Sequence, residues 1–317
     1  MIVASEAANG LLDRYSYVES LQGLRIKINN ELAQDRRHSF DILVFGTCYD
    51  ARGVMAPLME KETGLSCYNF APYDMQTILA SYCMLKNYLK THPQKPKYII
   101  IGANRMNISK PLTYLNIPYF YDFRKGNIAE FASELGPAQA VNFLLPSQKH
   151  QHLLRRFFEA PFSFKTVDRK RIDDFIEKVY RERGYDSDKE DVVYGGDAND
   201  RSEDPKFTVS GYYYKYIRAM LDLAGKNNIR VIYSMSSRPP DWYELEERHG
   251  IVKQYNAFVD LLKREYPALI VLNPQRLLNE KDMYSSSSHL NKKGARLLTR
   301  FLSEALTDQI QKRNDPA

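Results

Sequence analysis

Three side chains far apart in the chain have the types needed for acyl transfer: Cys48, Asn104 and His289. A cysteine thiol becomes a nucleophile when it loses its proton, and a histidine within hydrogen-bond reach can take that proton. An asparagine amide can donate to an oxygen that gains negative charge during the reaction. Each residue also has an ordinary structural role, since cysteines are often buried and inert. The elements that carry the three residues decide between these interpretations.

The stretch around Cys48 reads DILVFGTCYDARGVM. Residues 41–45 form a short apolar run of strand type that stops at Gly46, and the pattern turns helical from about residue 52. A buried strand that ends in this way puts the next side chains, Thr47 and Cys48, at the carboxyl edge of a sheet, where open α/β sheets bind ligands. Amides at the start of a helix favour negative charge there. Asp50 and Arg52 are expected to form a local ion pair.

The same alternation of strand, turn and helix is found on both sides of residues 105–210, where it is absent. Three such steps in succession imply parallel strands joined by crossover helices. We expect the further strands at residues 67–71, 97–101, 229–235 and 268–272. We expect helices at residues 52–63, 74–91, 212–224, 242–265 and 291–310.

The interruption covers residues 105–210, where no strand–helix alternation is visible. Helical pieces near 129–158 and 168–183 precede a polar, glycine-bearing stretch. We expect a helical insertion between the third and fourth strands, which could act as a lid or a binding surface. Residues 1–40 read as a helical lead-in, and residues 41–317 as one α/β domain that contains the insertion.

The loops that follow the strands share one edge of the expected sheet, because the carboxyl ends of parallel strands lie together. These loops are residues 46–48, 69–72, 102–104 and 285–290. His289 lies just before the closing helix, so it could face Cys48, or it could simply start that helix. Arg238 follows the fourth strand and could bind a carboxylate or phosphate, although a solvated arginine is the commoner case.

These segments resemble the SGNH (GDSL-like) hydrolase family. Gly46-Thr47-Cys48 occupies the place of the family's first block, and Gly102-Ala103-Asn104 that of its third, Gly-x-Asn block. His289-Leu290-Asn291, with Gly294, matches its last block. The resemblance covers residues 40–104 and 212–310. It implies a three-layer α/β/α fold with a flavodoxin-like, five-stranded parallel sheet, and an oxyanion hole made by the Cys48 amide and the Asn104 side chain.

Two departures from the family pattern bear on catalysis. Cys48 replaces the nucleophilic serine, and the acid three residues before the histidine is replaced by Ser286. A Cys48–His289 dyad is still chemically reasonable, because a thiol ionises more easily than a hydroxyl. The imidazole could be oriented by a backbone carbonyl, by a serine of residues 285–288, or by Asp282. Thr47, Asn69 and Arg238 are further candidates for orienting or substrate-binding roles.

Three classes of function follow. The first is an esterase or O-acyltransferase that acts on a polar ester through the dyad; the resemblance to bacterial relatives implies a cell-envelope glycan as one such ester. The second is a catalytically inactive member of the fold that serves as a binding or scaffold module. The third is a thiol-redox role for Cys48, which is weakly supported because no resolving cysteine is nearby in the sequence.

The amino-acid composition limits the kinds of ligand and partner that we expect for this chain. The chain has 317 residues and a net charge of +6, with charges of both signs mixed along it, so no nucleic-acid partner is expected. Three cysteines without a CxxC pair indicate neither a disulfide framework nor a zinc site, and we expect no metal and no cofactor. The 23 tyrosines suit a small-molecule or glycan ester, and they also suit an ordinary core.

No apolar run is long enough to cross a membrane, and residues 1–30 lack a signal-peptide core. The compartment stays open, periplasmic or cell-surface if a signal or anchor was removed and cytoplasmic otherwise. The oligomeric state stays open as well.

Overall fold

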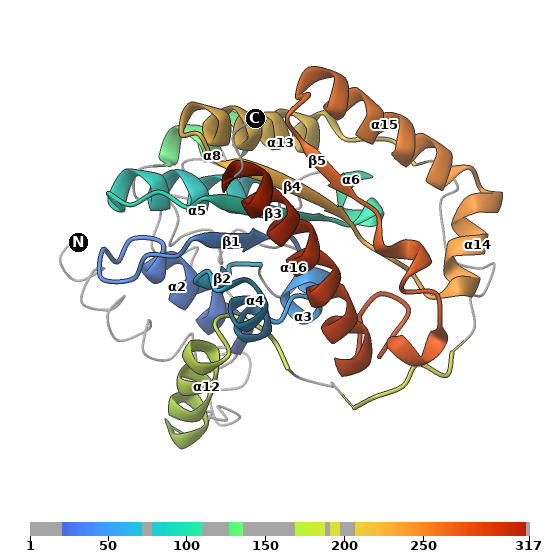
Figure 1. Cartoon of the computed structure of the whole chain (residues 1–317), viewed down its shortest axis with the longest axis horizontal. Coiled ribbons are helices and arrows are strands. Elements are labelled where there is room, and N and C mark those ends of the chain that lie inside the picture. Colours follow the sequence, from blue (N-terminus) through green and yellow to red (C-terminus); the bar gives the residue numbers. More distant parts are fainter. Residues whose placement is uncertain are drawn as a thin grey trace, which may run out of the picture.

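Five parallel strands form the centre of the molecule, in the order β2-β1-β3-β4-β5 (Figure 1). The strands are β1 (Ile42–Phe45), β2 (Cys67–Asn69), β3 (Tyr98–Ala103), β4 (Arg230–Met235) and β5 (Ile270–Leu272). Strands β1 to β3 are buried along their whole length, which explains why they read as continuous apolar runs in the sequence. The parallel sheet and its flavodoxin-like strand order are as predicted.

The computed structural model describes residues 21–71, 78–109, 127–135, 169–187, 191–196 and 207–314. Its α-helices are α2 (Leu21–Leu32), α3 (Cys48–Gly53), α4 (Ala56–Thr63), α5 (Ile78–Thr91), α6 (Arg105–Ser109), α8 (Ile128–Leu135), α12 (Arg169–Arg181), α13 (Gly211–Lys226), α14 (Pro240–Arg248), α15 (Ile251–Glu265) and α16 (Lys292–Asn314). Two short 3-10 helices are η3 (Pro274–Arg276) and η4 (Lys281–Met283). No helix within these residues has the length and apolarity needed to span a membrane.

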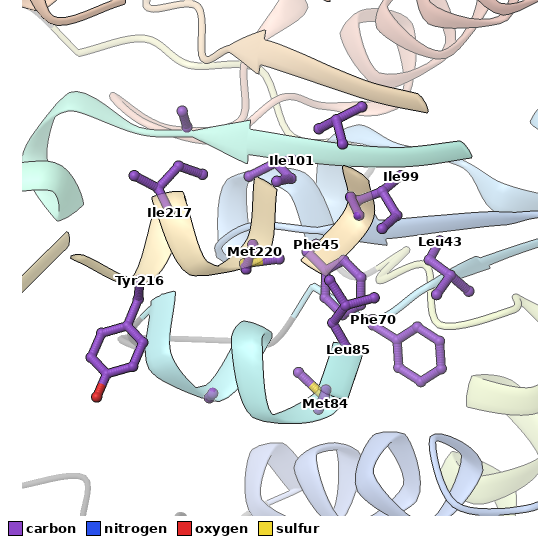
Figure 2. Close-up of a cluster of buried hydrophobic side chains, with 14 of the residues drawn as sticks. Leu43, Phe45, Phe70, Met84, Leu85, Ile99, Ile101, Tyr216, Ile217 and Met220 are labelled. Atoms are coloured by element: carbon purple, nitrogen blue, oxygen red, sulfur yellow. The ribbon is translucent and has the colours of Figure 1, made fainter. Parts of the chain in front are cut away.

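Helices cover both faces of the sheet and give the expected three layers. On one face, alternate strand residues pack against α5 and α13, as Figure 2 shows for Phe45, Ile99 and Ile101. On the other face, Ile42 and Val44 pack with residues of α4 and α16. The alternation follows from strand geometry, because successive side chains point to opposite faces. The described core therefore consists of two apolar layers separated by the sheet.

Two helices predicted as single are each divided in the structure. The pattern from residue 52 to 63 belongs to α3 and α4, because Thr47 caps a helix that already starts at Cys48, and Pro57 lies in the first turn of α4. The predicted helix at 242–265 is likewise α14 followed by α15. The two meet at Gly250, whose φ of 72° is left-handed backbone that glycine adopts without strain.

Smaller differences concern where elements end. β3 continues through Gly102 to Ala103, because its last residues pair in register with Ser234 and Met235 of β4. Both β2 and β5 are shorter than predicted. The first part of the predicted helix at 74–91 lies outside the described residues.

The segment predicted as an insertion is helical where the structure describes it. It contributes α6, α8 and α12, and α12 packs against α2 beyond the β2 edge of the sheet (Figure 1). Much of the predicted helical piece at 129–158 lies outside the described residues, as do residues 1–20 of the predicted lead-in. The division into a lead-in, a domain and an insertion stays a prediction.

Candidate active site

Cys48 is the first residue of α3, two residues beyond Gly46 at the end of β1. The helix starts here because Thr47 and Asp50 form a capping box: the Thr47 hydroxyl accepts from the Tyr49 amide, and the Asp50 carboxylate accepts from the Thr47 amide at 2.8 Å. The hydrogen bonds of Thr47 therefore stabilise the turn that carries Cys48. Cys48 itself is half-buried, whereas the other two cysteines are buried.

The Asp50 carboxylate fills the space above two glycines of neighbouring strands. A Cβ added at Gly46 would lie 2.2 Å from Asp50 Oδ2, and one at Gly102 would lie 1.7 Å from Oδ1. Burial raises the pKa of Asp50 to about 7, against the opposing effect of the hydrogen bonds from Thr47. The glycines of both family-like blocks thus make room for one buried carboxyl group, a role that the sequence analysis did not identify.

The expected local pair of Asp50 and Arg52 is replaced by longer-range partners. Arg52 Nε bonds to Asp186 Oδ2 at 3.1 Å, and Arg25 lies 3.6 Å from the other carboxylate oxygen of Asp186. The Asp186 amide also donates to the Ala51 carbonyl at 2.7 Å. The side chains of Arg25, Arg52 and Asp186 are all buried. This cluster fixes the outer side of α3, and hence the orientation of the turn that carries Cys48.

Asn69, a candidate for substrate binding, instead forms hydrogen bonds with the backbone at the C-terminal end of α3. Its Nδ2 donates to the carbonyls of Asp50 and Val54, both at 2.9 Å, and its Oδ1 accepts from the Ala71 amide. The residue is fully buried. Its amide is a second donor to the Asp50 carbonyl, which also accepts from the Val54 amide, and it donates to the Val54 carbonyl at the end of the helix.

His289 lies opposite the thiol, on the loop that precedes α16. Its Nε2 is 3.2 Å from Cys48 Sγ, although 241 positions separate the two residues. Its Nδ1 lies 2.9 Å from Ser286 Oγ and 3.1 Å from Ser288 Oγ. Both ring nitrogens therefore have partners, and the group beside Nδ1 is a pair of hydroxyls, where the family has a carboxylate.

The histidine loop is held by its own backbone. The Ser285 amide donates to the His289 carbonyl at 2.8 Å, and the chain crosses in an antiparallel bridge between Tyr284 and Leu290. Ser286 Oγ also accepts from the amides of Ser288 and His289. One serine hydroxyl thus shapes the loop and contacts the imidazole at the same time.

Asp282 and Arg238, the other candidates near this loop, have different partners. The Asp282 carboxylate bonds to Lys293 on the surface, and its carbonyl accepts from Asn291. Arg238 is buried; its Nε bonds to Glu246 at 3.1 Å and its Nη1 donates to the Ser287 carbonyl at 3.0 Å. Asp282 does not orient the imidazole, whereas Arg238 fixes the loop that carries it.

Asn104 follows β3, directly beside β1 in the sheet. Its side chain is 8% exposed and its backbone carbonyl accepts from the Ile108 amide at the start of α6. Cys48 and Asn104 therefore lie on the loops that follow two neighbouring parallel strands, and His289 reaches the same rim through its contact with Cys48.

The other two cysteines differ from Cys48 in access. Cys67 and Cys83 are fully buried, and burial raises the pKa of both thiols. A buried thiol with a raised pKa is a poor nucleophile. Of the three, Cys48 is the thiol that combines solvent access with a histidine partner.

The sequence was also compared with known proteins. No protein-family model and no curated protein matches the chain. Among solved structures, a GDSL-like lipase from Bacteroides thetaiotaomicron is similar over 89% of this chain and 95% of its own, with 13% identity and a TM-score of 0.40. An acetyl xylan esterase from the rumen bacterium Butyrivibrio proteoclasticus is similar over 86% of this chain and 64% of its own, with 9% identity and a TM-score of 0.36. The three-layer α/β/α fold, with its five parallel strands in flavodoxin-like order, is the fold that the SGNH (GDSL-like) resemblance implied.

Proposed function

We propose that this protein is an acyl-ester hydrolase or O-acyltransferase that works through a Cys48–His289 dyad. The observation that supports this most is the 3.2 Å approach of His289 Nε2 to the Cys48 sulfur, with Nδ1 held by serine hydroxyls. This is the geometry of a nucleophile and its general base, the base being oriented by a third group. The accessible thiol at the rim of the sheet is consistent with the same role.

The proposed reaction has two steps, acylation of Cys48 and transfer of the acyl group from the thioester to water or a sugar hydroxyl. His289 takes the thiol proton, Cys48 sulfur attacks the ester carbonyl, and a carbon–sulfur bond forms as the carbon–oxygen bond breaks. The imidazolium gives its proton to the departing alkoxide. Water, or a sugar hydroxyl, then attacks the thioester while His289 takes its proton, and the thiol is restored by return of that proton to sulfur.

The negative charge on the carbonyl oxygen would be stabilised by two donors on neighbouring loops. In the proposal these are the backbone amide of Cys48 and the side-chain amide of Asn104. A preorganised donor of this kind typically contributes a factor of about 10²–10³ to turnover. The proposed substrate is a polar ester, and a cell-envelope glycan ester is the specific candidate for it.

The serine hydroxyls beside His289 Nδ1 offer a chemical reason why the proposed nucleophile is a cysteine and not a serine. In a serine enzyme, loss of the orienting carboxylate lowers turnover by about 10⁴. A neutral hydroxyl stabilises an imidazolium less than a carboxylate does. The lower intrinsic pKa of a thiol reduces the help that the nucleophile requires from its base.

The test uses a short-chain aryl acetate for turnover and iodoacetamide for thiol reactivity, with the modified cysteine located by mass spectrometry. We expect turnover in the wild type, and its loss in Cys48→Ala and His289→Ala. Cys67→Ala and His249→Ala serve as matched controls, because they change a buried thiol and a histidine outside the rim. Turnover that persists in both rim variants would refute the dyad.

One observation favours a second candidate, a catalytically inactive binding or scaffold protein. Ser286 stands where the family has an acid, and the groups described beside Nδ1 are the hydroxyls of Ser286 and Ser288. In that case no ester in a panel of acetylated sugars and aryl esters would be hydrolysed. Cys48 would also react with iodoacetamide at the rate of an ordinary free thiol, and His289→Ala would leave that rate unchanged.

A further inference from the structure

Behind the rim, two arginines share one buried carboxylate. Glu246 of α14 accepts from Arg105 Nη1 through Oε2, and from Arg238 Nε through Oε1 at 3.1 Å. The three side chains, which we term the Arg105 cluster, are 2%, 4% and 7% exposed for Arg105, Arg238 and Glu246. Two positive charges against one negative charge leave the cluster with a net charge of +1.

Arg105 uses only part of its hydrogen-bonding capacity. Its Nε and Nη2 are buried and have no hydrogen-bond partner in the described part of the chain. Arg238, in contrast, bonds through Nε to Glu246 and through Nη1 to the Ser287 carbonyl. Buried donors without partners cost free energy, and charged donors cost more, so such a group in a native protein requires an explanation.

The two open nitrogens are adjacent on one edge of the guanidinium. That edge presents two parallel N–H bonds, the arrangement that binds both oxygens of a carboxylate or phosphate. The rings of Tyr243 and Tyr255 lie 5.3 and 5.4 Å from the guanidinium carbon. Their faces offset part of the buried charge, but they cannot accept the in-plane N–H groups of this edge.

The neighbourhood contains a second unsatisfied group. Ser236 Oγ, just beyond β4, is buried and without a hydrogen-bond partner among the described residues. Its amide donates to the Ala103 carbonyl at 2.9 Å, so Ser236 lies beside the end of β3, where Asn104 and Arg105 follow. Unused hydrogen-bonding groups therefore lie on the segments that follow β3 and β4, two neighbouring strands, and Asn104 belongs to the first of these segments.

We propose that Arg105 forms an anion-binding subsite that takes the carboxylate or phosphate group of a substrate beside the Cys48 thiol. The open guanidinium edge would bind two oxygens of the anion, and the Ser236 hydroxyl would donate to it. Shielding from water strengthens this charge interaction. The subsite rests on the proposed function and adds to it the prediction that the acyl or leaving group of the substrate has a negative charge. Binding of an anion to Arg105 can be measured without any turnover.

The first experiment measures binding of inorganic phosphate to the full chain by calorimetry, and thermal unfolding in phosphate against sodium chloride of equal ionic strength. We expect binding and a phosphate-specific rise in Tm for the wild type. Arg105→Lys keeps the charge but removes the two-donor edge, so its affinity for phosphate should fall at least about 10-fold. Arg300→Met, a change at an exposed arginine on α16, is the matched control and should leave phosphate affinity unchanged.

A second variant keeps the test decisive if Arg105→Lys does not fold. Glu246→Gln removes the one negative charge of the cluster, so phosphate affinity should increase. Equal phosphate affinity in the wild type and both variants, or no phosphate binding by the wild type, would overturn the subsite. If water alone satisfies Arg105, phosphate would give no specific rise in Tm, and the proposal would again be overturned.

The second experiment separates a substrate-borne anion from a free one. An aryl hemisuccinate, which carries a carboxylate, is compared with the aryl butyrate of similar length. The wild type should prefer the charged ester in kcat/KM, and Arg105→Lys should lose that preference, mainly through KM. If the wild type has no esterase activity but binds phosphate through Arg105, the subsite stands and the proposed reaction fails; equal kcat/KM for both esters contradicts a substrate role.

Discussion

Arg238 donates a 3.0 Å hydrogen bond to the carbonyl oxygen of Ser287, two residues before His289. The same guanidinium is fixed by Glu246, and the Arg238 backbone amide donates to Gln275 Oε1 at 2.8 Å. The imidazole is thus positioned by a loop that is itself tied to the end of the fourth strand. The position of His289 opposite Cys48 depends on packing between segments that are distant in the sequence.

Shortening or neutralising Arg238 should therefore affect catalysis without touching substrate. Arg238→Lys can keep the charge beside Glu246 but cannot bridge to Ser287, so turnover of an aryl ester should fall on the order of 10–100-fold through misplacement of the imidazole. Arg238→Met should also lower the free energy of unfolding by about 1.5–3 kcal/mol, because it removes the buried hydrogen bonds of Arg238 to Glu246 and to the Ser287 carbonyl, while Arg105 still pairs with Glu246. A fall in kcat with unchanged KM for Arg238→Lys would identify positioning. Unchanged kcat would refute it.

Restoring an acid at position 286 should strengthen the dyad. In Ser286→Asp a carboxylate would replace the hydroxyl 2.9 Å from Nδ1, and it would stabilise a thiolate–imidazolium pair. Alkylation of Cys48 by iodoacetamide should then persist to lower pH than in the wild type. Ser286→Asn, which has a similar size without the charge, is the control. An unaltered pH profile of alkylation in Ser286→Asp would show that the hydroxyl contact does not govern the imidazole.

Asp50 predicts a specific pH dependence of stability. Its pKa is raised from the ordinary value of 3.8 to about 7 by burial, so the folded protein retains a proton that the unfolded chain has released. Its contribution is complete below about pH 4, and it is lost as the pH rises through about 7. Asp50→Asn should remove this part of the slope, which thermal unfolding from pH 4 to 8 would measure. Asp260→Asn, on the exposed face of α15, should retain the wild-type slope.

Gly102 should not tolerate a side chain while Asp50 is present. A methyl group at this position would lie 1.7 Å from Asp50 Oδ1, and overpacking of this kind costs about 3 kcal/mol or more. Gly102→Ala should therefore lower the unfolding midpoint in urea, and the double variant Asp50→Ala/Gly102→Ala should recover part of the loss.

Gly225→Ala is the control for this cycle, because nothing lies within 4 Å of an added Cβ on α13. We expect that change to be neutral or to stabilise by about 0.5–1 kcal/mol. Equal effects at Gly102 in the presence and absence of Asp50 would contradict the proposed clash.

Local sequence patterns determined the sheet and the rim. Apolar runs such as residues 42–45 and 98–101 are typical of strands buried on both faces in a covered parallel sheet. The flavodoxin-like order of the strands was implied by the resemblance to the SGNH (GDSL-like) family. The loops that carry Cys48 and Asn104 are expected at one rim because each comes directly after a strand of a parallel sheet.

Only the tertiary structure decided which side chains are hydrogen-bond or ion-pair partners. The partners of Arg52, Asn69, Asp282 and Arg238 differ from those that the sequence suggested, because each side chain has several donors or acceptors and its partners depend on which loops meet in space. A serine of residues 285–288 was one of three groups suggested for the imidazole, and the structure places Ser286 and Ser288 beside Nδ1. The position of the Asp50 carboxyl group above two glycines was not predicted. Residue types and periodicity carry no information about such contacts, since they are formed by segments far apart along the chain and fixed by packing.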